Sequence, residues 1–178
     1  AYTVYFYLVS DTPFEITRTW KDGVISDASY QYDSGKGTGV LVSFPDDADV
    51  VNVKVGISHL GCMKARANVN EEIDHWDLQQ TRDELIAKWD AILSKVELDP
   101  MTPEPYKRMF YTALYHTYQY PVDKTGENPY WVDGEPYFDD YYALGDTYRT
   151  SLPMRTLITP EMTVDFIRSL ISTYVNDK

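Results

Sequence analysis

The fold class is decided by residues 51–61, which read VNVKVGISHLG. Every second position up to residue 57 carries a branched apolar side chain, and small or polar residues stand between them. This period of two predicts a strand with one apolar and one polar face. Residues 40–44 repeat the alternation. After Gly61 the apolar residues recur at helical spacing instead, so the chain is expected to combine strands with helices.

The first 60 residues predict β structure alone. Turn-forming sequences, GKGTG at 35–39 and PDDAD at 45–49, separate the strand patterns. Strands at this spacing without helices between them predict an antiparallel sheet, most simply closed as a β-sandwich. GKGTG resembles a phosphate-binding loop but lacks the Gly-Lys-Ser/Thr ending and leads into a strand. We therefore interpret it as a hairpin turn.

The remainder of the chain predicts helices over residues 76–96, 104–120, 148–158 and 160–175. In the first of these, Trp76 and Trp89 share one apolar stripe. Two helix starts have a hydroxyl cap followed by proline and an acidic residue, Thr102-Pro103-Glu104 and Thr159-Pro160-Glu161.

A long loop from Val122 to Leu144 separates the middle helices and is rich in Asp, Gly and Tyr. Loops of this length inside compact domains are mostly functional or disordered. The aromatic residues concentrated between Tyr130 and Tyr142 argue against disorder.

Composition excludes several kinds of partner. The 28 acidic and 16 basic residues give a net charge of -12. That charge repels nucleic-acid phosphates and anionic membrane surfaces, so we expect no nucleic-acid or membrane partner. The single cysteine, Cys62, cannot form an internal disulfide and is expected to be a buried small apolar residue. The chain begins in a strand pattern and ends in a helix pattern, so we expect an internal piece of a longer protein.

No known catalytic motif is present. The sequence has no Gly-x-Ser-x-Gly, His-Glu-x-x-His, Cys-x-x-Cys or EF-hand loop. His59, His75 and His116 are scattered, and a lone histidine is more often structural than catalytic.

The segment from Tyr137 to Thr150 carries the most chemical information. Asp146 and Arg149 are three apart at an expected helix start, so they would share one face. In the simplest interpretation the acid stabilises the helix N-terminus. In the functional one, its carboxylate accepts hydrogen bonds from two sugar hydroxyls while Arg149 donates to it. Nearby tyrosines and Trp131 offer flat faces for the C–H face of a pyranose.

Several motifs in this region resemble those of glycoside hydrolase family 92, the calcium-dependent exo-α-mannosidases. They are DTYRT at 146–150, LPMRTLITPE at 152–161 and IRSLISTY at 167–174, preceded by FYTALYH at 110–116 and VKVGIS at 53–58. The resemblance runs in order over essentially the whole chain. It implies an α+β multidomain arrangement: part of an N-terminal antiparallel β-sandwich in 1–60, a helical linker in 61–100, and the first helices of an (α/α)6 catalytic barrel in 101–178.

The resemblance also implies an activity. Family members hydrolyse terminal α-linked mannose from glycans with inversion, and we expect α-1,2 linkages as substrate. One carboxylic acid protonates the leaving oxygen, and a carboxylate roughly 6.5–9.5 Å away activates water. Ca2+ binds mannose hydroxyls. The resemblance further implies a secreted, extracellular or periplasmic protein.

Carried over to this sequence, Asp146 matches the aspartate that binds the terminal mannose, and Arg149 is its neighbour. We expect Tyr142 and His116 to complete the substrate-binding set. The acid, the base and the calcium ligands are implied to lie beyond Lys178, so no catalytic or metal-binding residue is assigned in this chain. Gly145 departs from the family pattern, which has tryptophan there; the missing indole would loosen the sugar pocket or change linkage preference, unless Tyr141 or Tyr142 fills the space.

Two other functions stay open. One is a carbohydrate-binding module without turnover, which downstream carboxylates in the parent gene would argue against. The other is a structural subunit whose helices pair with another chain, which predicts a natural stop codon near residue 178. The expected helices cannot close a six-hairpin barrel, so we also expect a large exposed apolar surface.

Overall fold

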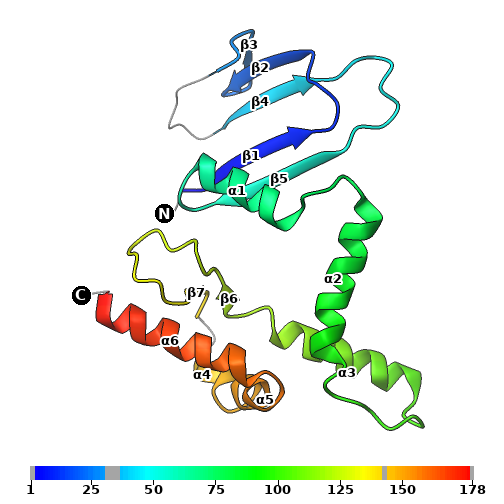
Figure 1. Cartoon of the computed structure of the whole chain (residues 1–178), viewed down its shortest axis with the longest axis vertical. Helices are drawn as coiled ribbons and strands as arrows, with labels where there is room; N and C mark the ends of the chain where they lie inside the picture. Colours follow the sequence, from blue (N-terminus) through cyan, green and yellow to red (C-terminus); the bar gives the residue numbers. More distant parts are fainter. Residues whose placement is uncertain (1–2, 31–36, 142–143, 177–178) are drawn as a thin grey trace. The chain divides into compact units, whose positions relative to one another are not determined.

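A computed structural model describes residues 3–30, 37–141 and 144–176 of the protein. It forms two compact units, one from Val4 to Trp76 and the other containing Asp77–Lys178. The first unit has the strands expected from the alternating pattern together with one helix. The second is mainly helical (Figure 1). The predicted α+β composition is thus confirmed. The division at Trp76 does not coincide with the boundaries expected at residues 60 and 100, which stay predictions.

The first unit contains two small antiparallel sheets. One pairs β1 with β5, and the other has the order β3-β2-β4. The antiparallel pairing is as predicted. The strands are β1 (Tyr5–Ser10), β2 (Ile16–Lys21), β3 (Val24–Ser26), β4 (Thr38–Ser43) and β5 (Val53–Ser58).

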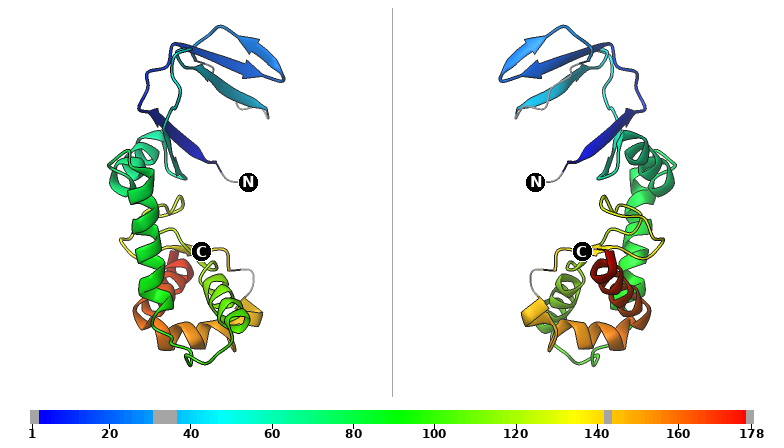
Figure 2. Two further views of the ribbon diagram at one scale, coloured as in Figure 1. Left: turned by 90° about the vertical axis from the view of Figure 1, so that its right-hand side faces the viewer. Right: turned by 90° about the vertical axis from the view of Figure 1, so that its left-hand side faces the viewer.

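Helix α1 (Cys62–Glu72) packs on the small and polar face of the β1–β5 sheet, beside Gly56 (Figure 1 and Figure 2). Ala65 and Val69 of α1 are buried there, at 0% and 5% exposure. The apolar face of the same strand is open, and Val55 is 58% exposed. The alternation of β5 is therefore confirmed. Within this unit, however, α1 covers the small and polar face of the strand, which contains Gly56, and not its apolar face.

Gly56 lets the α1 backbone approach the sheet. A Cβ at this position would clash with the Ala65 carbonyl oxygen and the Val69 side chain. We predict that Gly56→Ala lowers the free energy of unfolding of this unit by about 1–3 kcal/mol, the usual range for overpacking. Urea unfolding measures the effect. Gly61→Ala is the matched control, because a Cβ at Gly61 meets nothing within 4 Å; equal stability of the two variants would contradict the prediction.

The second unit contains α2 to α6 and one two-stranded ribbon, β6 with β7. Its elements are α2 (Leu78–Leu93), α3 (Glu104–Thr117), β6 (Val122–Asp123), β7 (Phe138–Asp139), α4 (Leu144–Thr147), α5 (Ser151–Ile158) and α6 (Pro160–Asn176). The predicted helices are confirmed, with changed ends. The helix expected over 148–158 is α5, which begins at Ser151, and the separate one-turn helix α4 precedes it.

Three local expectations are wrong. Helix α2 begins at Leu78 because Asp77 caps it, its Oδ1 accepting from the N–H groups of Gln79 and Gln80 at 2.9 and 3.0 Å. Trp76 therefore lies outside the helix, and its ring is 4.2 Å from the Lys54 ammonium. The N-cap of α3 is Pro103, without a side-chain cap from Thr102.

The third wrong expectation concerns Cys62, which is exposed rather than buried. It is the first residue of α1, and the buried residues of this helix, Ala65 and Val69, follow it. Helical spacing places Cys62 on the same side as Ala65, three residues away, so its exposure follows from its place at the helix end rather than from its face.

Apolar surface is exposed on the second unit as well. On α6, Val164, Ile167, Ile171 and Tyr174 are 56%, 49%, 58% and 82% exposed. Among the helices in the described ranges, none has both the length and the apolar character needed to cross a membrane.

Candidate functional site

The loop between α3 and α4 is anchored on α6. Ser169 is 1% exposed, and its Oγ accepts from the Phe138 N–H at 2.8 Å and lies 3.0 Å from the Tyr141 hydroxyl. The Phe138 ring, also 1% exposed, packs edge-on against Phe166 with centroids 5.8 Å apart. These contacts attach the described part of the loop to α6.

A second row of hydrogen bonds continues this attachment toward the end of α6. Trp131 Nε1 donates to Ser172 Oγ at 2.9 Å, and Ser172 Oγ in turn donates to Asp133. Asn176 Nδ2 donates to the same Asp133 oxygen at 3.0 Å. Because Ser169, Ser172 and Asn176 are spaced by three and four residues, they form one face of the helix.

The electrostatics of the loop follow from these contacts. Hydrogen bonds from Ser172 and from the Glu135 N–H hold the pKa of Asp133 below its usual value. Burial, aided by the nearby Asp139 carboxylate, raises the pKa of Tyr137 to about 12. Burial also raises the pKa of Tyr141. Both phenols are therefore neutral hydrogen-bonding groups at physiological pH.

The lowered pKa of Asp133 predicts an acid-sensitive loop. A carboxyl whose pKa is lower folded than unfolded stabilises the fold above the unfolded value, here 3.8, and loses this contribution as pH falls through the folded pKa. We expect the Trp131 indole N–H to lose its protection from exchange only at pH values below 3.8, where Asp133 is protonated. Two-dimensional NMR of that N–H measures it. In Asp133→Asn the step should vanish, and an unchanged midpoint in that variant would contradict the prediction.

Asp146 lies in the short helix α4, and both it and Arg149 are exposed. The Arg149 guanidinium lies 4.8 Å from the Tyr148 ring centroid. Within the described ranges no ion pair joins Arg149 to Asp146, so the expected contact between the two is not seen. The reason is that α4 ends at Thr147, and Arg149 falls in the turn before α5 rather than on the same helical face.

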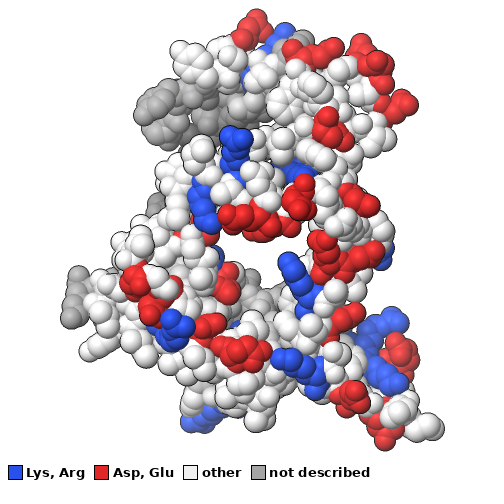
Figure 3. Space-filling view, viewed as in Figure 1, with Lys and Arg blue, Asp and Glu red and all other residues white. Residues whose placement is uncertain are grey.

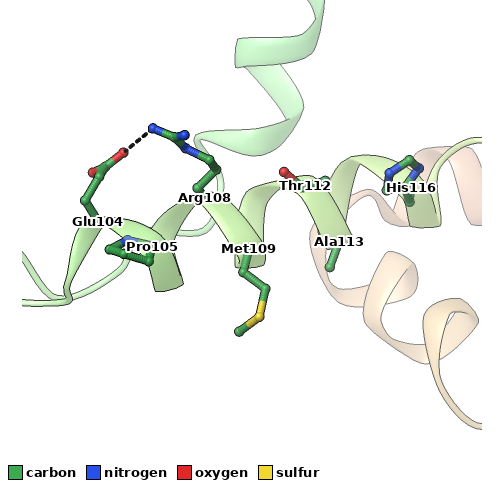
Figure 4. A pocket seen from close by; sticks show the side chains of 7 residues that line it. All are labelled: Glu104, Pro105, Arg108, Met109, Thr112, Ala113 and His116. Atoms are coloured by element: carbon green, nitrogen blue, oxygen red, sulfur yellow. Dashed lines mark ion pairs between the residues drawn. The ribbon is translucent and has the colours of Figure 1, made fainter.

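His116 lies near the end of α3, where its Nδ1 is 3.1 Å from Gln119 Oε1. It borders a cavity of about 630 Å³ along one face of α3. Met109 also lines this cavity, as do Glu104 and Arg108, which form an ion pair at 3.9 Å (Figure 4). Asp146 is not among the residues that line this cavity. Tyr142 lies outside the described residues.

Gly145 precedes Asp146 and is exposed. A Cβ on Gly145 would meet nothing within 4 Å, so there is room for a side chain at this position. Tyr141 does not fill that space, because its hydroxyl is directed to Ser169 and its ring lies 5.8 Å from Phe166.

Arg155 was not recognised as important from the sequence. It is 3% exposed, its Nη1 donates to the Tyr120 carbonyl at 3.1 Å, and its guanidinium lies 5.0 Å from the Tyr118 ring. Burial lowers its pKa. The Tyr118 hydroxyl also contacts Thr159 Oγ1 at 3.1 Å. These contacts fasten α5, which follows Asp146, to the end of α3. The sequence does contain one indication of this burial. Arg155 is three residues from both Leu152 and Ile158, so it lies on the apolar face of the expected helix.

The described residues do not provide a metal site. Across residues 3–30, 37–141 and 144–176, no three His, Cys, Asp or Glu side chains gather closely enough to hold a metal ion. The acidic residues instead spread over the visible surface, with fewer basic residues between them (Figure 3). The described residues therefore contain no cluster of acidic side chains that would hold a calcium ion.

The fold is similar to solved glycosidases. A GH92 family glycosyl hydrolase superposes with a TM-score of 0.80 and 25% identity, over 99% of this chain and 24% of that one. A family GH92 α-mannosidase from Bacteroides thetaiotaomicron gives a TM-score of 0.79 and 26% identity, over 96% of this chain and 25% of that one. That enzyme has also been solved in complex with mannoimidazole.

A curated protein is similar in sequence. An uncharacterized secreted glycosidase from Arthroderma benhamiae is 35% identical over 102 residues, which are 56% of this chain and 13% of that protein. The chain thus spans about a quarter of the length of the solved relatives and less of the curated one. Residues 64–178 match the family model described as the glycosyl hydrolase family 92 catalytic domain. The chain belongs to glycosyl hydrolase family 92.

Proposed function

We propose that this chain is part of an exo-α-mannosidase that hydrolyses terminal α-linked mannose, preferentially α-1,2-linked, from glycans with inversion. The observation that carries the proposal is the family match over residues 64–178, which includes Asp146 and its DTYRT motif. The likeness to a solved α-mannosidase over 96% of the chain supports the choice of mannose.

In this proposal Asp146 binds two neighbouring hydroxyls of the terminal mannose. Its carboxylate is exposed, and none of the ion pairs in the described ranges uses it, so both oxygens can accept hydrogen bonds. Arg149 donates to sugar oxygens directly, with its orientation limited by the Tyr148 ring. A neutral sugar is not repelled by the acidic surface.

Tyr142 and His116 are proposed to complete the substrate contacts. Hydrolysis with inversion requires a carboxylic acid and a carboxylate base roughly 6.5–9.5 Å apart. Neither is assigned in this chain, so this chain's proposed task is to bind and orient the sugar. Ca2+ is proposed to be held by residues outside this chain.

Secretion is proposed as well, because the curated relative is a secreted glycosidase. The second candidate function, a carbohydrate-binding module without turnover, keeps the same role for Asp146.

Calcium removal tests the proposal against this second candidate. The full-length protein that contains this chain is incubated with α-1,2-mannobiose, and free mannose is measured before and after EDTA treatment. We expect release that EDTA reduces at least roughly tenfold and that added Ca2+ restores. Binding of the disaccharide without any release, with calcium present, would contradict the mannosidase and favour the binding module.

A further inference from the structure

A second cavity, of about 420 Å³, lies between the α3–α4 loop and α6. From the loop it is lined by Asp133 and Glu135. From the helix it is lined by Arg168, Ile171, Ser172, Val175 and Asn176. These helical positions are three and four residues apart, so they form one face. Neither Asp146 nor His116 borders it.

The polar groups of this cavity are held in place before any ligand arrives. Arg168 Nε donates to Glu135 Oε2 at 2.8 Å, and this contact raises the pKa of Arg168. Arg168 Nη1 also lies 3.5 Å from Asp165. Asn176 is oriented by its bond to Asp133. A carboxylate, a guanidinium and an amide with fixed directions are the groups that recognise sugar hydroxyls.

The floor of the cavity is apolar. Ile171 and Val175 are 58% and 55% exposed. Aliphatic surface beside fixed polar groups suits a pyranose, which has both C–H and hydroxyl faces.

The Glu135–Arg168 ion pair is not needed to attach the loop to α6. The buried contacts of Ser169 and Ser172 already hold the loop. The Glu135–Arg168 pair is 39% and 49% exposed, and exposed ion pairs contribute only about 0–1 kcal/mol. Glu135 Oε1 takes part in none of the hydrogen bonds of the described residues, so it can accept from a ligand.

The charged residues that line this cavity indicate which class of ligand it can bind. Among the lining residues two carboxylates, Asp133 and Glu135, stand against the one guanidinium of Arg168, so an anionic ligand is disfavoured. In the described part of the chain no acidic cluster here meets the requirement for a metal ion. A neutral polar ligand with an apolar face fits both conditions.

We propose that this cavity is a second carbohydrate-binding site, which takes a neutral hexopyranose unit of a glycan separately from Asp146. The choice of a mannose-containing glycan rests on the proposed function. Glu135 accepts from a hydroxyl of this sugar, Arg168 donates to it, and Ile171 and Val175 contact its C–H face.

The test is calorimetric titration of the full-length protein with linear α-1,2-linked mannotriose. In an Asp146→Asn background, where the first site is impaired, the trisaccharide is expected still to bind. Adding Glu135→Gln should weaken that binding at least roughly tenfold, because a hydrogen bond to a charged acceptor is lost. Ile171→Asn, which leaves every loop contact in place, should weaken it too.

Asp90→Asn is the control, since Asp90 is an exposed carboxylate on α2 that does not line the cavity, and it should leave the affinity unchanged. Equal affinity of Asp146→Asn with and without Glu135→Gln, or no binding in Asp146→Asn, would overturn the second site. These outcomes are independent of catalysis. If the unmodified protein releases no mannose, the proposed function fails, while binding that depends on Glu135 would still support this site.

Discussion

Replacing Asp146 with asparagine is expected to lower kcat/KM for mannose release roughly 100-fold. Each hydrogen bond from a sugar hydroxyl to a carboxylate contributes about 1.5–3 kcal/mol, and about 2.7 kcal/mol corresponds to 100-fold in rate. The amide that replaces the carboxylate has one acceptor oxygen and no charge. Steady-state kinetics on α-1,2-mannobiose measures the loss.

The fold should be unaffected by this change, because Asp146 is exposed. Thr150 Oγ1 donates to the Asp146 backbone carbonyl, which asparagine keeps. Asp90→Asn, at an exposed position of α2, is the control and should retain full activity. An Asp146→Asn enzyme with unchanged kcat/KM would show that Asp146 only stabilises the start of α4.

Replacing Phe138 with alanine is expected to lower the free energy of unfolding of the second unit by about 3–5 kcal/mol. Phe138 is 1% exposed and packs edge-on against Phe166, so truncation removes buried apolar surface and leaves a cavity. The Phe138 backbone N–H also donates a hydrogen bond to Ser169 Oγ, and loss of the ring would weaken that hydrogen bond. Urea unfolding measures the difference.

Tyr130→Ala is the matched control, since Tyr130 belongs to the same loop but is 72% exposed. It should change stability by no more than about 0.5 kcal/mol. A loss below about 1 kcal/mol in Phe138→Ala would mean that the loop does not depend on its packing against α6.

Local patterns predicted the elements of this fold, since strand alternation and helical spacing depend on neighbouring residues. The alternation over 51–57 located β5, and Pro160 marked the first residue of α6. The same patterns could not tell which face of β5 would be covered. That depends on Gly56 allowing α1 to approach, a contact that only the folded chain contains.

Helix ends and polar helix faces were harder to predict. Trp76 fits the apolar stripe of α2, but the side chain of Asp77 caps the helix after it. Ser169 and Ser172 look like the solvent face of an amphipathic helix, yet they are buried because the loop turns its polar groups toward them. Such contacts join residues about 30–40 apart and leave no local signal.

The candidate site was predicted only in part. The position of Asp146 in a helix start is as expected, but a one-turn α4 leaves Arg149 outside the helix. Propensity alone does not predict where one helix divides into two. The buried Arg155 was missed for a related reason, since arginine is ordinarily exposed and only its place under Tyr118 shows its role.

The most direct test of the central claim follows the hydrolysis of an α-mannoside by proton NMR, using the full-length protein that contains this chain. The account predicts that mannose is released and that the β-anomer accumulates first, before mutarotation brings in the α-anomer. Release of α-mannose first would contradict inversion. No release of mannose from any α-linked substrate by the folded protein, with calcium present, would contradict the mannosidase itself.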